Sequence, residues 1–168
     1  MRVVCDSTVL IGLAKVNKLH ILPGIFSEIY IPKAVYNEVV IDGKGKPGSE
    51  EIANANWIRR KAVKDEISVQ MLARYIDRGE AEVLILGKEI ETDWLVIDDD
   101  KARDVASAAN FKVIGLVGLL VVAKQLKLIH QVKPILDELK SKMFHIGNEI
   151  YEQGLKEAGE SFTSREKM

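Results

Sequence analysis

The sequence is poor in cysteine and has no long uninterrupted apolar run. Its only thiol, Cys5, cannot form an intramolecular disulfide, which excludes a disulfide-stabilised secreted scaffold and is typical of a reducing compartment. The longest apolar stretch, from Phe111 to Ala123, is interrupted by Lys112, whereas a membrane-spanning helix needs about 20 apolar residues. The first 15 residues contain Asp6 and no cleavable apolar segment. We therefore expect a cytoplasmic protein with no membrane partner.

The chain also lacks a net positive charge and has few histidines. The formal net charge is −1, whereas proteins that hold nucleic acid by charge alone are usually basic. Any RNA binding must therefore come from local Lys and Arg side chains or from a bound metal ion. The three histidines, His20, His130 and His145, lack the spacing of zinc ligands, which argues against a zinc site and against a Ser-His-Asp triad. There is no glycine-rich phosphate loop.

What is present is an alternation of short apolar strands and amphipathic helices. The predicted strands are 2–5, 28–31, 57–58, 94–97 and 112–114. The predicted helices are 8–16, 33–40, 66–75, 80–89, 101–109, 115–127, 131–142 and 148–158. This order predicts an α/β fold with a parallel sheet covered on both faces. We assign residues 1–160 to a single domain and residues 161–168 to a disordered polar tail.

Acidic residues follow two of these strands directly. Asp6 follows the first strand, and Asp98 and Asp99 follow strand 94–97. Parallel strands share one carboxyl edge, and ligands bind beyond it where the strand order reverses. If the two strands are neighbours there, their carboxylates repel unless a cation lies between them. Mg²⁺ and Mn²⁺ prefer such oxygen ligands.

Two further acids could join this group, and each acid also has a purely structural interpretation. Glu38 lies among apolar residues of helix 33–40, and Glu80 lies in the first turn of an apolar helix, where it favours the helix dipole. Asp6 could be only a helix N-cap. The Asp98–Asp100 run could be a solvated turn, and Glu82 could be an ordinary helix acid. The prediction depends on the whole set and not on any single member.

The chain resembles the PIN-domain family from Arg2 to about Lys127. Four segments carry the resemblance: VVCDSTVLIGL at 3–13, IPKAVYNEV at 31–39, GEAEV at 79–83 and LVIDDDKAR at 95–103. The branch it is most similar to is that of VapC-type prokaryotic toxins, which GLVGLL at 115–120 and AGE at 158–160 also resemble. In place of Glu80 many of these toxins have Asp, and in place of Ile97 they have Thr. These departures bear on catalytic efficiency more than on fold.

The resemblance implies a three-layer α/β/α domain with a five-stranded parallel sheet and additional C-terminal helices. It also implies an endoribonuclease that uses Mg²⁺ or Mn²⁺, acts as the toxin of a toxin–antitoxin pair, forms a homodimer and is silenced by an antitoxin protein. The implied catalytic residues are Asp6, Glu38, Glu80 and Asp99. The implied metal ligands are Asp6, Asp98, Asp99 and Glu80, with Asp99 favoured over Asp98 at the fourth motif.

Substrate contacts are predicted from hydroxyl and basic side chains. Ser7, Thr8 and Arg103 are the candidates for substrate binding, with N-capping as the alternative for the hydroxyls and pairing with an acid as the favoured alternative for Arg103. Lys15, Lys18, Arg59, Arg60 and Lys61 are candidates for RNA contact. The leading rival is a catalytically inactive PIN-like module that binds RNA or protein. A receiver-type phospho-acceptor domain is disfavoured, because it needs an acidic pair after the first strand.

Overall fold

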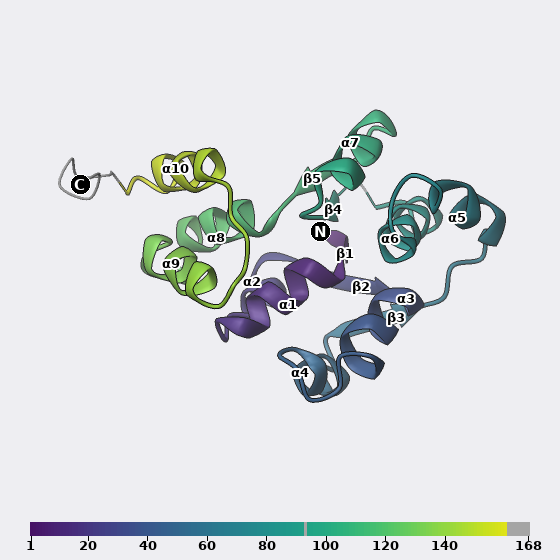
Figure 1. Ribbon diagram of the computed structural model, residues 1–168, viewed down its shortest axis with the longest axis horizontal. Helices are drawn as coiled ribbons and strands as arrows, with labels where there is room; N and C mark the ends of the chain where they lie inside the picture. The colour runs from purple at the N-terminus through teal and green to yellow at the C-terminus, as the bar shows by residue number, and fades with distance from the viewer. Residues whose placement is uncertain (93, 161–168) are drawn as a thin grey trace. The chain divides into compact units, whose positions relative to one another are not determined.

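The computed structural model describes residues 1–92 and 94–160 (Figure 1). Its strands are β1 (Arg2–Cys5), β2 (Glu28–Pro32), β3 (Ile58–Lys61), β4 (Trp94–Val96) and β5 (Lys112–Ile114). They form one sheet in the order β3-β2-β1-β4-β5, and every neighbouring pair is parallel. The predicted α/β class and five-stranded parallel sheet are therefore confirmed.

The centre of the sheet is β1, which explains its composition. Val3, Val4 and Cys5 are all completely buried, as expected for a strand covered on both faces. Val4 pairs with Tyr30 of β2 on one side and with Leu95 of β4 on the other. The strand order reverses at β1, because β2 and β3 lie on one side of it and β4 and β5 lie on the other. The acids that follow β1 and β4 can meet only if these two strands are neighbours, and in this sheet they are.

Helices flank the sheet in a three-layer α/β/α arrangement. The helices up to the final strand are α1 (Ser7–Lys15), α2 (Ile21–Ile25), α3 (Lys33–Tyr36), α4 (Ser49–Asn54), α5 (Glu66–Leu72), α6 (Arg78–Glu89) and α7 (Asp100–Ala108). Helix α6 packs on β1, β2 and β4. A Cβ atom at Gly87 would lie 2.6 Å from Leu95 Cδ2, so glycine permits the close approach of α6 to β4.

Several element boundaries differ from the predicted ones. The predicted helix 33–40 is a short α-helix, α3, continued by the π-helical turn η1 (Asn37–Ile41). Helices α2 and α4 were not predicted, because five or six residues are too few to show a helical period. Strand β3 extends to Lys61 and not only over 57–58, because its exposed edge residues carry charge in place of the apolar pattern of a buried strand.

Backbone contacts divide the chain into two compact units, Met1–Leu116 and Val117–Met168. Helix α8 (Leu116–Gln125) begins at the boundary, and α9 (Lys133–Ser141) and α10 (Asn148–Glu157) belong to the second unit. The assignment of residues 1–160 to one domain stays a prediction. The predicted tail, 161–168, lies outside the described residues. Among the helices that the structure describes, none has the length and apolar character needed to cross a membrane.

Candidate active site

The carboxyl ends of β1 and β4 are tied together by backbone pairing. Cys5 pairs with Val96, and the next amide, Asp6 N, donates to Val96 O at 2.9 Å. Asp6 therefore begins where β1 leaves the sheet, and Asp98 follows β4 beside it. This is the point of strand reversal at which ligands of parallel sheets bind.

Asp6 is a buried carboxylate, with 2% of its surface exposed. Its Oδ1 accepts from Val9 N, capping α1, and its Oδ2 accepts from Asp98 N, both at 2.9 Å. Burial raises the pKa of Asp6 to about 7, and the charges of Asp98 and Glu80 add to the rise against the two hydrogen bonds. The N-cap interpretation is correct, yet each oxygen keeps a second lone pair for another ligand.

Glu80 reaches the same edge from the first turn of α6. It forms a capping box with Asp77, in which Glu80 Oε2 accepts from Asp77 N at 3.2 Å. The pKa of Glu80 is raised to about 7. Burial is the largest cause, the negative charge of Asp99 is the next, and the charges of Asp77 and Glu38 contribute less. Asp77 is not among the acids predicted from the sequence, although its spacing from Glu80 is the sequence signature of a capping box.

Glu38 lies beside the start of α6, in the π-helical turn after α3. A Cβ atom at Gly79 would lie 3.3 Å from Glu38 Oε2. The absence of a side chain at Gly79 thus leaves room for the Glu38 carboxylate next to Glu80. The structure therefore brings Glu38 toward the same acidic group as Asp6, Glu80 and Asp99.

The two acids after β4 have different surroundings. Asp98 Oδ1 accepts from Leu116 N at 3.1 Å, and burial raises the pKa of Asp98, although the Arg103 charge opposes the rise. Asp99 is exposed, and its Oδ2 caps α7 by accepting from Ala102 N at 3.0 Å. Since Asp99 is also the leading negative charge acting on Glu80, its carboxylate faces the site. Asp100 begins α7 and is exposed.

Other predicted residues lie at the margin of this group. Ser7 is buried as the first residue of α1, whereas Thr8 is exposed. Arg103 lies near Asp98, because a Cβ atom at Gly115 would meet both Arg103 Nη1 and Asp98 Oδ1, at 2.5 and 3.0 Å. Arg103 thus lies near an acid, and its pairing with one stays a prediction.

Glu82 is committed to the structure elsewhere. It is buried, its Oε1 accepts from Ala34 N at 3.2 Å, and its Oε2 pairs with Arg78 Nε at 3.0 Å. Glu82 therefore satisfies the start of α3 and joins it to α6. Its neighbour two residues earlier, Glu80, is the acid of this helix that faces the other carboxylates.

The carboxylate oxygens of this acidic group are the kind of ligand that a hard divalent cation prefers. Within residues 1–92 and 94–160, no three His, Cys, Asp or Glu side chains are already gathered tightly enough to enclose an ion. Mg²⁺ usually keeps several waters and binds through only one or two carboxylates. Carboxylates gathered at one edge of a sheet provide the negative potential for such a hydrated ion. The residues present therefore fit Mg²⁺ or Mn²⁺ held partly through water.

The basic candidates differ in what they contact. Arg59 Nη1 pairs with Glu28 Oε1 at 3.3 Å. Arg60 stacks on the Tyr36 ring, with its guanidinium carbon 3.9 Å from the ring centroid. Lys61 is exposed at the end of β3. The three consecutive cations of this strand are thus unequally available to a ligand.

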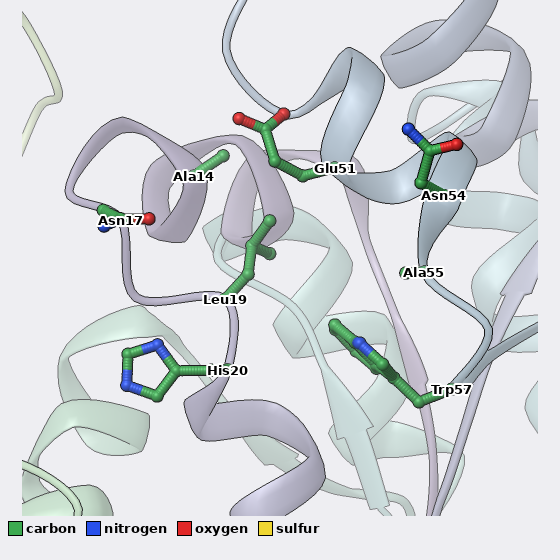
Figure 2. A pocket seen from close by; sticks show the side chains of 8 residues that line it. All are labelled: Ala14, Asn17, Leu19, His20, Glu51, Asn54, Ala55 and Trp57. Carbon is green, nitrogen blue, oxygen red and sulfur yellow. The ribbon is translucent and has the colours of Figure 1, made fainter.

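A hollow of about 290 Å³ (Figure 2) has none of the candidate active-site acids in its lining. It is lined by Ala14, Asn17, Leu19, His20, Glu51, Asn54, Ala55 and Trp57. Trp57 precedes β3 and Asn17 follows α1, so this hollow lies at the amino edge of the strands. The acidic group lies at the carboxyl edge, where Asp6 is buried and Asp99 is exposed.

Comparison with known proteins bears on this arrangement. No curated protein is significantly similar to the chain. A family model described as a PIN domain matches residues 2–160, which is nearly the whole of the described chain. With its parallel sheet and its acids at the point of strand reversal, the chain belongs to the PIN-domain family, whose fold is a nuclease fold.

Proposed function

We propose that this protein is a Mg²⁺- or Mn²⁺-dependent endoribonuclease that hydrolyses phosphodiester bonds of RNA. The observation that carries the proposal is the convergence of acids from separate elements at the reversal point of the sheet. Burial is the leading cause that raises the pKa of Asp6 and that of Glu80 to about 7, and repulsion by neighbouring carboxylates, Asp98 and Glu80 for Asp6 and Asp99 for Glu80, adds to it. A fold that only needed stability would gain nothing from this repulsion.

The mechanism assigns roles to the residues of the chain. Asp6, Glu80 and Asp99 would hold the cation, with Asp98 and Glu38 contributing through water. When bound, the cation supplies a Lewis acid for the phosphate and lowers the pKa of a water nucleophile. Asp6 is held in place by two backbone amides, and Asp98 accepts from Leu116 N and is subject to the positive charge of Arg103. Ser7 and Thr8 would donate hydrogen bonds to the phosphate.

We also propose a biological setting for this activity. The resemblance of residues 115–120 and 158–160 to VapC-type proteins supports a toxin role, an antitoxin partner and a homodimer. The single cysteine, Cys5, is buried and unbonded, which supports a cytoplasmic location.

RNA cleavage tests the proposal directly. A labelled mixed-sequence RNA is incubated with wild type, Asp6→Asn and Glu80→Gln in Mg²⁺ or Mn²⁺, and with wild type in EDTA. We expect wild type to cut, and EDTA and each substitution to reduce the rate by at least about 100-fold, which is the upper end of the cost of losing only an outer-shell partner of a metal ligand. Asp104→Asn, which removes an exposed acid of α7, is the matched control and should cut like wild type.

Folding and metal binding are measured on the same variants. Asn at position 6 offers one acceptor oxygen where Asp offers two, so circular dichroism must show that the variant is folded before its activity is interpreted. Mg²⁺ should raise the melting temperature of wild type and not that of Glu80→Gln. If folded wild type never cuts RNA, the inactive binding module becomes the better assignment.

A further inference from the structure

The exposed edge strand β3 carries the consecutive cations Arg59, Arg60 and Lys61. Successive side chains of a strand point to opposite faces, so Arg59 and Arg60 cannot share one environment. Arg59 is occupied: it pairs with Glu28 at 3.3 Å and donates to the Tyr30 hydroxyl at 3.4 Å. Arg59 therefore has an acidic partner as well as an aromatic one, the Tyr30 ring, whose centroid lies 5.8 Å from its guanidinium carbon.

Arg60 has an aromatic partner in place of an acidic one. Its guanidinium carbon lies 3.9 Å from the centroid of the Tyr36 ring. No carboxylate of the described residues comes within ion-pair distance of Arg60. The side chain is exposed while Tyr36 is half-buried. The planar guanidinium group of Arg60 is thus held on the Tyr36 ring, and its charge forms no ion pair with the described residues.

The sheet places this pair at the same edge as the acids. Cys5 pairs with Val96 and Ile31 pairs with Arg60. Val4, Tyr30 and Arg59 form one row across the sheet, so Cys5, Ile31 and Arg60 form the next. Asp6 is one residue beyond Cys5. Arg60 therefore lies two strand spacings, about 10 Å, to the side of the candidate active site.

We infer that Arg60, stacked on Tyr36, is a platform for an unpaired base of the RNA whose backbone lies at the acids. The inference rests on the proposed function and adds a positioning residue to it. Planar guanidinium groups and aromatic rings stack with any base, and bases of single strands are accessible where those of a duplex are not. An acidic peptide would need the charge of Arg60 and not the ring beneath it.

The test is the affinity of a fluorescent single-stranded RNA for the full chain in EDTA, where cleavage is suppressed. Arg60→Gln should weaken binding about tenfold, as for loss of one stacked base. The matched control Arg59→Gln removes the same charge one residue away and should weaken binding by less than about twofold. Arg60→Lys should bind nearly as weakly as Arg60→Gln, and Tyr36→Phe, which keeps the ring, should bind like wild type.

Several outcomes would overturn the platform. These are equal weakening by Arg59→Gln and Arg60→Gln, full binding by Arg60→Lys, or unchanged RNA binding with weaker binding of an acidic peptide. Melting temperatures check that each variant is folded. We expect little change in Arg60→Gln, because Arg60 is an exposed residue of an edge strand.

Cleavage kinetics separate this inference from the proposed function. With Mg²⁺, Arg60→Gln should raise KM and leave kcat unchanged. A protein that cuts RNA with an unaltered KM in Arg60→Gln has the activity and lacks the platform. A protein that needs Arg60 to bind RNA and never cuts it has the platform and lacks the activity.

Discussion

At the scale of single residues, Asp6 and Glu80 have raised pKa values for related reasons. Burial is the leading cause for both, and neighbouring carboxylates add to it. Asp6 is stabilised by two amide donors, whereas Glu80 accepts one, from Asp77. Ionising these groups in the metal-free protein costs free energy, because water cannot fully solvate them and like charges are near.

This cost predicts a pH-dependent gain from Glu80→Gln. The folded-state pKa of Glu80, about 7, lies above its ordinary value of 4.5. Folding is therefore favoured by this group below pH 4.5, and the contribution is lost as pH rises through 7. Glutamine keeps the capping box and removes the charge. In EDTA at pH 8 the free energy of unfolding should rise by about 1 kcal/mol, a figure discounted for partial exposure.

Denaturant unfolding at two pH values checks the prediction. The gain should vanish at pH 4.5, where Glu80 of wild type carries its proton. Glu152→Gln, at an exposed position of α10, should show no gain at either pH. A gain of equal size at both pH values would mean that charge repulsion is not its cause.

At the scale of elements, one carboxylate connects the last three helices. Glu160 accepts from Val132 N at 2.8 Å and from Lys133 N at 3.0 Å, capping the start of α9. It also pairs with Lys124 of α8 at 3.0 Å. Burial raises the pKa of Glu160, but the hydrogen bonds and the ion pair outweigh burial and hold it below its usual value.

We expect Glu160→Gln to loosen this helical unit. Glutamine has one acceptor oxygen for two amide donors and no charge for Lys124, so the free energy of unfolding should fall by about 1–3 kcal/mol at pH 7. Because the folded-state pKa is lowered, the difference from wild type should shrink as pH falls below 4.5. Hydrogen exchange of the backbone amides of α8 to α10 measures this loss of stability, with Glu152→Gln as the control. Wild-type protection in Glu160→Gln at pH 7 would contradict this role.

At the scale of the whole molecule, charge is close to balanced. The net charge is −1 and the pI is about 6.3, and several arginines are already paired with acids of the fold. If RNA is the substrate, we therefore expect it to be bound by a few local contacts and not by a broad positive surface.

A shallow salt dependence follows from this balance. Two or three phosphate contacts to a single strand give a slope of log affinity against log salt of about −1.4 to −2.1. The measurement is the affinity for RNA in EDTA at NaCl concentrations between about 50 and about 200 mM, the range over which salt effects on nucleic-acid binding are usually compared. A slope steeper than about −5 would require a wide cationic surface and would contradict the local mode of binding.

Much of the fold was predictable because buried parallel strands have a strong sequence signature. The runs at Val3–Cys5 and Leu95–Ile97 are apolar and end abruptly in acid, which correctly placed Asp6, Asp98 and Asp99 at strand ends. Helices α2 and α4 and the π-helical turn after α3 were not predictable, because short elements depend on tertiary packing more than on local preference.

The sequence by itself determined which residue types lie at each strand end, since hydrophobic burial and local capping act over a few neighbouring positions. Only the tertiary structure decided which of them meet. The adjacency of β1 and β4 brings Asp6 next to Asp98, and the packing of α6 turns Glu80 toward the acids while Glu82 holds α3. In β3 the alternation of side chains leaves Arg60 on Tyr36 and Arg59 on Glu28. These choices depend on strand order and on which face is covered, and both arise from contacts between residues far apart in the chain.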